Sequence, residues 1–451
     1  MADLLMNDIL GTPAILVGLF ALFGLLLQKK NIADIVSGTL KTVMGFVLLS
    51  AGATVLVSSL DNFSKMFDYA FGLEGIIPNN EAIVALAQDA FGTETAMIML
   101  FGMLANILFA RFTPFKFIFL TGHHTMFMAC LIAVILMTGG FTGVPLIIMG
   151  SIILGSLMVL LPAMIQPYTR KITGSDDFAI GHFGSMGYLV SGFIGSLVGK
   201  NSKSTEEIKV PKSLGFLRDT SVSVSLTMGI LFFVVAAFAG PTFVEEQLSG
   251  GMNSYVFSFM QAITFAAGVF IILSGVRMLL AEIVPAFKGI ADKVVPNAIP
   301  ALDAPAIFPF ASNAVVIGFL FSFIAGLVSM FLLPLMGLKV IVPGLVPHFF
   351  TGAAAGVFGN ATGGRKGAIF GSLANGFLIS FLPALLLPVL GSLGFQGTTF
   401  GDADFGVVGI ILGNLINLFP SKIVFSAVVL ILIAVIFYLG AMKKKSSISK
   451  L

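Results

Sequence analysis

Long apolar stretches dominate the pattern of this chain and are separated by short polar turns. A helix that crosses a membrane needs about 20 predominantly apolar residues. Eleven stretches approach or exceed that length, near residues 13–28, 38–60, 95–112, 117–138, 143–166, 220–240, 255–283, 313–336, 340–362, 367–393 and 421–441. The pattern therefore predicts an all-α polytopic membrane protein with about eleven transmembrane helices.

Two further apolar stretches, near 178–199 and 406–419, are interrupted by glycine and are too short to cross a bilayer. We expect them to form re-entrant hairpins. Non-helical backbone at membrane depth is tolerated only where protein or a watery cavity satisfies its polar groups. Such stretches are therefore candidates for lining a binding site.

The composition excludes the competing classes of protein. Hydrophobic residues make up 57% of the 451 positions and charged residues only 10%, against about 25% charged in a soluble domain. This hydrophobicity excludes intrinsic disorder, and the single cysteine, Cys130, excludes a disulfide scaffold. A porin-type barrel would show short alternating segments instead of long apolar runs.

The positive residues predict the orientation, because Lys and Arg concentrate on the cytoplasmic side of membrane proteins. With eleven spans and the N-terminus outside, all but three of the 24 Lys and Arg residues face the cytoplasm. The three exceptions are Lys65, Lys339 and Lys422. An N-out, C-in arrangement follows, whereas ten or twelve spans would scatter the positive residues over both sides.

The two halves of the chain resemble each other at an offset near 221–225 residues. GSIILGSLMVLLPAM at 150–164 aligns with GSLANGFLISFLPAL at 371–385. Chance similarity between Gly- and Leu-rich helices is the alternative, but the offset persists over about 100 residues. Because each unit holds five spans, the second copy would lie inverted. We expect a first inverted repeat at 1–199, a cytoplasmic linker at 200–219, a second repeat at 220–419, and a final span with a basic tail at 420–451.

Inverted repeats are typical of transporters, whose sites lie near the midplane beside broken helices. Aligning Pro78 with Pro300 places Glu81 opposite Asp303. A carboxylate in a membrane is costly and usually functional, and it accepts hydrogen bonds from the hydroxyls of a sugar-like ligand. The alternative is a helix N-cap, since both acids follow Pro-containing turns.

The four histidines also fall at expected helix breaks. A neutral imidazole both donates and accepts hydrogen bonds, so His123 and His182 are the preferred ligand contacts, ahead of His124 and His348. A helix-bridging role is the alternative. The spacing of His, Asp, Glu and Cys resembles no metal site, and neither a P-loop nor a catalytic triad occurs. We expect no catalytic residue, no metal and no cofactor.

Several long motifs resemble the ascorbate-type membrane subunit (IIC) of the bacterial phosphotransferase system, over about residues 15–440. They are FVLLSAGATVL (46–56), LTGHHTMFMACLIAV (120–134), FAIGH (178–182), IPALDAPAIFPFASNAVVIGF (299–319) and VPGLVPHFFTGAAAGVFGNATGG (342–364). The resemblance implies a multi-pass permease of the bacterial cytoplasmic (inner) membrane for L-ascorbate or a related sugar acid, sugar or polyol.

The resemblance further implies a homodimer with a core domain that moves in elevator fashion against a V-shaped domain. A separate IIB protein carrying a phosphocysteine, charged through IIA, would phosphorylate the sugar on the cytoplasmic side. Cys130 lies in an apolar run and is not that cysteine. The phosphoryl-transfer residues would thus lie on the partners, and no nucleic-acid partner is expected.

Carried over by position, the ligand contacts of the family fall on Asn80, Glu81, His123, Phe127, His182, Phe183 and Asp303. His123, His182 and Asp303 match the ascorbate pattern. The family pattern has glutamine at the positions of Phe127 and Phe183 and a Thr-Tyr pair at 80–81. Each lost partner of a ligand hydroxyl costs about 1–3 kcal/mol, and Glu81 disfavours an anion. A one-residue shift of this alignment around TGHH (121–124) would instead place Met128 or His124 in the pocket.

Two other functions are compatible with this pattern. An ion-coupled secondary transporter could use Glu81 or Asp303 as its proton carrier, and dependence on phosphoenolpyruvate would separate it from a phosphotransferase permease. An integral-membrane enzyme would need the same acids and histidines for acid–base chemistry. No nucleophile accompanies them in the sequence, which disfavours the enzyme.

Overall fold

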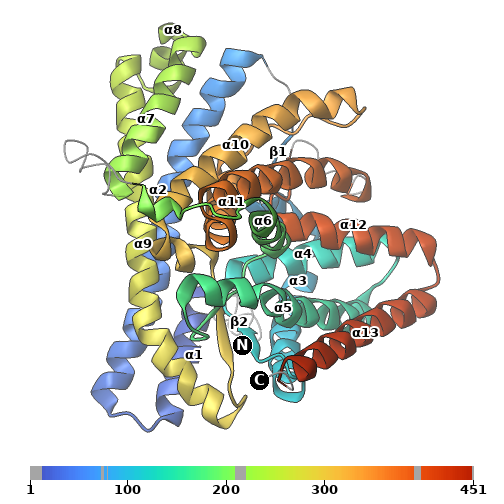
Figure 1. The fold of residues 1–451 in the computed structure, drawn as a ribbon. Coiled ribbons are helices and arrows are strands. Elements are labelled where there is room, and N and C mark those ends of the chain that lie inside the picture. The colour runs from blue at the N-terminus through green and yellow to red at the C-terminus, as the bar shows by residue number, and fades with distance from the viewer. Residues whose placement is uncertain (1–12, 73–75, 79, 209–219, 391–397, 449–451) are drawn as a thin grey trace.

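The computed structural model describes residues 13–72, 76–78, 80–208, 220–390 and 398–448. Helices account for most of them (Figure 1). They are α1 (Pro13–Leu27), α2 (Ile32–Phe71), α3 (Asn80–Phe112), α4 (Gly122–Thr138), α5 (Gly143–Thr173), α6 (Ser185–Val198), α7 (Thr220–Ala239), α8 (Pro241–Phe243), α9 (Ser254–Lys293), α10 (Ser312–Leu335), α11 (Leu345–Leu390), α12 (Ala403–Leu418) and α13 (Lys422–Ile448). Short turns η2 (Thr205–Glu207), η4 (Val244–Leu248) and η5 (Ala304–Phe310) complete the helical part.

Helical structure occurs in each of the eleven predicted apolar stretches. The stretches at 340–362 and 367–393 share the long helix α11, which is broken by non-helical backbone at Gly363 and Gly364. Across the described residues, six helices are long and apolar enough to cross a membrane, or seven if α7 and the segment Pro241–Leu248, bent by 104°, count as one span. The protein is therefore a multi-pass, all-α membrane protein, and the count of eleven spans stays a prediction.

Three shorter apolar helices each follow a short strand. Strand β3 (Ala179–Ile180) leads into α6, and β5 (Thr398–Thr399) leads into α12. These are the two Gly-rich stretches expected to be re-entrant, and their helices have only 14 and 16 residues. The expected span at 117–138 is divided in the same way, into β2 (Phe117–Phe119) and the 17-residue α4.

The strands form two small parallel sheets that join the halves of the chain. In the first, β4 (Ile299–Leu302) lies between β2 and β3, in the order β2-β4-β3. In the second, β1 (Ile77–Pro78) pairs with β5, and Ile76 bridges to Ile341. Each half thus contributes one segment, 76–78 or β4, that pairs with two segments of the other half. Pro78 and Pro300, which the repeat alignment matches to each other, lie in β1 and β4.

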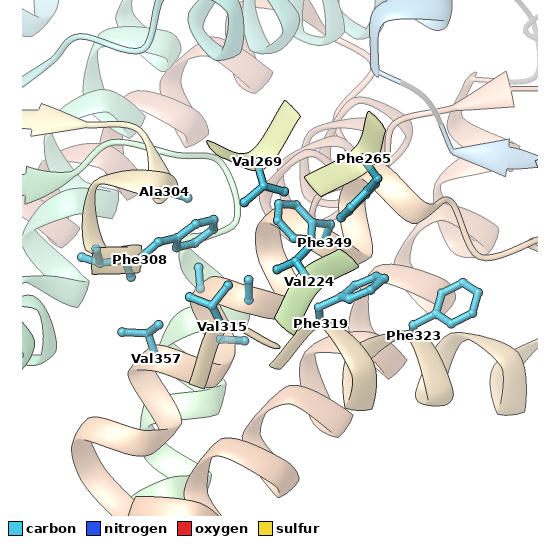
Figure 2. Close-up of a cluster of buried hydrophobic side chains, with 14 of the residues drawn as sticks. Val224, Phe265, Val269, Ala304, Phe308, Val315, Phe319, Phe323, Phe349 and Val357 are labelled. Carbon is cyan, nitrogen blue, oxygen red and sulfur yellow. The ribbon is translucent and has the colours of Figure 1, made fainter. Parts of the chain in front are cut away.

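Two apolar clusters hold the helices together. One gathers side chains of α2, α7, α9, α10 and α11, with Phe349 packed edge-on against Phe265 and Phe319 at ring-centroid distances of 5.3 and 5.6 Å (Figure 2). The other surrounds α4, which is buried over nearly its whole length. A helix that is apolar on every side is expected at the centre of a bundle. Most of the first turn of α4 is buried as well, with Gly122, His124 and Thr125 inside the protein.

Candidate functional site

His123, His182 and Asp303 come together where three strands end. They follow β2, β3 and β4 in the chain, and these strands are parallel, so their carboxyl ends meet at one edge of the sheet. The Nε2 atom of His123 lies 3.6 Å from Oδ2 of Asp303, and Nε2 of His182 lies 3.9 Å from Oδ1. Each imidazole thus faces one oxygen of the same carboxylate. Both distances exceed a hydrogen bond, which leaves space for a ligand atom.

Local structure fixes the direction of each of these side chains. Asp303 is the N-cap of η5, and its Oδ1 accepts a 2.7 Å hydrogen bond from the backbone N–H of Ala304. The capping and the binding interpretations of Asp303 are therefore compatible. His123 lies in the first turn of α4 and is 31% exposed. His182 is buried, and its Nδ1 shares a 2.9 Å hydrogen bond with the hydroxyl of Tyr188.

His124 also belongs to this cluster, whereas His348 does not take part in it. The His124 ring lies 3.9 Å from the His182 ring, centroid to centroid, and stacks on Phe405. Its Nδ1 is buried and has no hydrogen-bond partner in the described part of the chain. His348 shares a 2.9 Å hydrogen bond with Ser322 of α10 and packs against Phe323. Met128 is fully buried in the apolar cluster around α4.

Two phenylalanines, at positions that the family resemblance assigns to ligand contacts, lie beside the cluster. Phe127 is one turn after His123 in α4, with ring centroids 5.8 Å apart, and is 5% exposed. Phe183 follows His182 directly, is fully buried, and stacks on Phe119 at 4.9 Å. They give the polar cluster an apolar wall that offers dispersion contacts and no hydrogen bonds.

Asn80 is held by the segment after β5. Its side-chain amide donates a 2.8 Å hydrogen bond to Oδ2 of Asp402, and its Oδ1 accepts one of 2.9 Å from the backbone N–H of Gly401. Glu81 lies in the first turn of α3, but its side chain falls outside the described part of the structure. The predicted pairing of Glu81 with Asp303 therefore stays a prediction.

Sequence reasoning missed three buried residues, Tyr188, Asp402 and Asp404. The two oxygens of Asp404 accept hydrogen bonds of 2.9 and 2.8 Å from the backbone N–H groups of Ser185 and Met186, at the start of α6. The signal was the run GDADF at 401–405, which places two acids at the entrance of a Gly-rich apolar stretch. A carboxylate in such a place is usually functional or paired.

Two sets of three potential metal ligands occur among the described residues. One comprises His123, His124 and Asp303, and the other His124, His182 and Asp402; within each set one ligand atom per residue lies within 4.8 Å of the others. The sequence predicted no metal site because these residues are scattered over four segments of the chain. Chemically, the cluster can donate and accept hydrogen bonds to a polyhydroxy ligand, and it can also hold a cation.

A polar cluster at interrupted helices of a multi-pass helical protein is typical of membrane transport proteins. The chain belongs to the PTS system sugar-specific permease family (EIIC-GAT), which matches residues 8–404. It is 29% identical to the "Ascorbate-specific PTS system EIIC component" of Mycoplasma pneumoniae, in an alignment of 457 residues that covers 88% of this chain and 68% of the relative.

These similarities confirm the family that the sequence motifs indicated. The chain is a sugar permease component of the phosphotransferase system, and such components work with the IIA and IIB proteins. The ion-coupled secondary transporter is not favoured.

Proposed function

We propose that this permease carries L-ascorbate, or a closely related sugar acid, sugar or polyol, across the bacterial cytoplasmic membrane. His123, His182 and Asp303 bind the substrate, with Asn80, Glu81, Phe127 and Phe183 around it. The observation that carries the proposal is the placement of the two imidazoles on the two oxygens of Asp303, at 3.6 and 3.9 Å. The ascorbate-specific relative supports the substrate class.

The spacing suits hydroxyl groups. A hydroxyl oxygen about 2.8 Å from both an imidazole nitrogen and a carboxylate oxygen fits between atoms that are themselves 3.6–3.9 Å apart. It donates its proton to the carboxylate and accepts from the imidazole N–H. Because Asp303 offers two oxygens to two imidazoles, it suits neighbouring hydroxyls on one ring. Phe127, which lies beside His123, covers an apolar face of that ring.

We further propose eleven spans with the N-terminus outside, arranged as two inverted repeats. The reciprocal pairing of strands supports the repeats, because β4 joins two segments of the first half while β1 and Ile76 join two segments of the second. The distribution of Lys and Arg supports the orientation. Helices α6 and α12 would then be the re-entrant elements at the centre of the two repeats.

We infer the mechanism from the family resemblance, and the position of the site on interrupted helices is compatible with it. A core that contains the site would move as a rigid body in elevator fashion against the dimerisation domain of a homodimer. The bound sugar would then be exposed to the cytoplasm, where a phosphocysteine of IIB transfers its phosphoryl group to a sugar hydroxyl. This chain binds and presents the substrate, while IIA and IIB supply the phosphoryl group.

The test is phosphoenolpyruvate-dependent uptake. The chain is produced with its IIA and IIB proteins in a bacterium that lacks its own ascorbate system, and labelled ascorbate, sugar acids, hexoses and polyols are supplied. Phosphorylated product should accumulate only with IIB present, and Asp303→Asn and His123→Ala should abolish it while His348→Gln does not. Accumulation of unmodified substrate driven by an ion gradient would contradict the proposal.

A further inference from the structure

His124 is the point at which two sets of ligand-type side chains meet. His124 forms one set with His182 and Asp402, and all three residues of this set are buried. It forms the other set with His123 and Asp303, and this set is partly exposed. The residues come from α4, the β3–α6 junction, the β4–η5 junction and the segment before α12. Helices and strands from both halves of the chain therefore present nitrogen and oxygen ligands to one small volume.

The ligand atoms of the buried set His124, His182 and Asp402 are close enough together for one ion. Zinc binds imidazole nitrogen and carboxylate oxygen at about 2.0–2.2 Å in tetrahedral geometry, which places neighbouring ligand atoms about 3.3 Å apart. One ligand atom each of His124, His182 and Asp402 lies within 4.8 Å of the other two. Small side-chain movements would close the cluster on an ion.

The unpartnered nitrogen of His124 is a second, independent observation. His124 is 5% exposed, and its buried Nδ1 has no hydrogen-bond partner among the described residues. Buried polar atoms in proteins almost always have a partner, and a bound ion or water is among the explanations for an exception. The rings of His124 and His182 are 3.9 Å apart, so a metal ion could use both.

The surroundings resemble the support that metal ligands usually have. A ligating histidine commonly donates its other ring N–H to a fixed partner, and a ligating carboxylate is itself hydrogen-bonded. When Nδ1 of His182 carries the proton, it donates to the Tyr188 hydroxyl at 2.9 Å and leaves a lone pair on Nε2. Asp402 accepts the hydrogen bond from Asn80.

We propose that His124, His182 and Asp402 bind a divalent transition-metal ion of the zinc type. Imidazole and carboxylate ligands suit Zn²⁺, whereas Ca²⁺ and Mg²⁺ prefer sites built from oxygen. The positive charge of the ion would offset the negative charge of the buried Asp402 carboxylate. This goes beyond the proposed transport function, but the ion would share His182 with the substrate site, so the two activities are measured separately.

The test is a calorimetric titration of Zn²⁺ into the purified full-length protein in detergent, after treatment with a chelator. We expect one ion per chain. His124→Ala and Asp402→Asn should weaken binding at least about 10-fold, and Tyr188→Phe about 10- to 100-fold, the usual cost of removing a supporting partner. The matched control is His348→Gln, because His348 is buried but lies outside the cluster. This variant should bind Zn²⁺ as tightly as the wild type.

Titration of Co²⁺ gives a readout that does not depend on the variants. Visible absorption bands of tetrahedral Co²⁺ in the wild type support the site even where a variant fails to fold. Weak binding of several ions, equal in the wild type and in His124→Ala, would overturn the inference, as would the absence of both Zn²⁺ heat and a Co²⁺ spectrum. Phosphorylated ascorbate formed by a protein that binds no Zn²⁺ would overturn the metal site and leave the transport function intact.

Discussion

Asn80 donates a 2.8 Å hydrogen bond from its side-chain amide to the carboxylate of Asp402, which lies 322 positions later in the chain. Both residues are buried. The bond lies beside the parallel pairing of β1 with β5 and joins the start of α3 to the segment before α12. It therefore fastens the first half of the chain to the second, next to the candidate site.

Replacing Asn80 by alanine should destabilise the protein. The substitution leaves a buried carboxylate oxygen and the N–H of Gly401 without this partner, which costs about 1–3 kcal/mol. The measurement is thermal unfolding of the purified protein in detergent. Asn414→Ala is the matched control, because that amide lies exposed on α12 and donates only within its own helix. Equal unfolding temperatures for the two variants would contradict the prediction.

Asp404 should stabilise the junction that carries His182 and Phe183. Its carboxylate accepts from the two backbone N–H groups that begin α6, and an N-terminal acceptor contributes about 0.5–2 kcal/mol. Asp404→Ala should lower the unfolding temperature and also weaken ascorbate binding, because the His182 backbone loses its support. Asp61→Ala removes an exposed carboxylate that bridges Lys65 and should change neither quantity. Normal ascorbate affinity in a destabilised Asp404→Ala protein would show that the cap does not position the site.

The two phenylalanines of the site should respond differently to glutamine. Phe127 lies at the edge of the cluster beside His123, so Phe127→Gln adds a hydrogen-bonding group and should tighten ascorbate binding in a thermal-shift titration. Phe183 is fully buried between Phe119 and Phe405. Phe183→Gln should destabilise the fold by about 1–3 kcal/mol, because it buries an amide among aromatic rings. Weaker ascorbate binding in a stable Phe127→Gln protein would contradict the prediction.

The break in α11 depends on Gly364. This glycine has φ of +56°, and a Cβ atom there would meet the backbone carbonyls of Ser202 and Lys203. Gly364→Ala should therefore cost more than the 1–2 kcal/mol of a left-handed alanine alone. Gly72 has φ of +60° and ψ of +33°, with no described atom within 4 Å of the added Cβ, so Gly72→Ala measures the cost of a left-handed alanine without a steric clash. The prediction requires a lower unfolding temperature for Gly364→Ala than for Gly72→Ala, and equal values would contradict it.

The sequence by itself determined the class of the protein and most of its helices. Continuous apolar runs of about 20 residues have few alternatives to helices in a membrane, and helical structure is present in every predicted stretch. The sequence also indicated His123, His182 and Asp303 as candidate ligand contacts, because polar groups at breaks in apolar runs are energetically costly and usually have a function. Family motifs added Phe127 and Phe183, which lie beside these residues in the structure.

Only the tertiary structure decided which polar residues meet. Nothing in the order of residues distinguished His124, which faces His182, from His348, which bonds to Ser322. Asp402 and Asp404 gained their partners through the pairing of β1 with β5 and the contact of α12 with the start of α6. Helix formation depends on neighbours within a few positions, whereas the convergence of strand ends depends on contacts between distant segments, which the spacing of residues along the chain does not record.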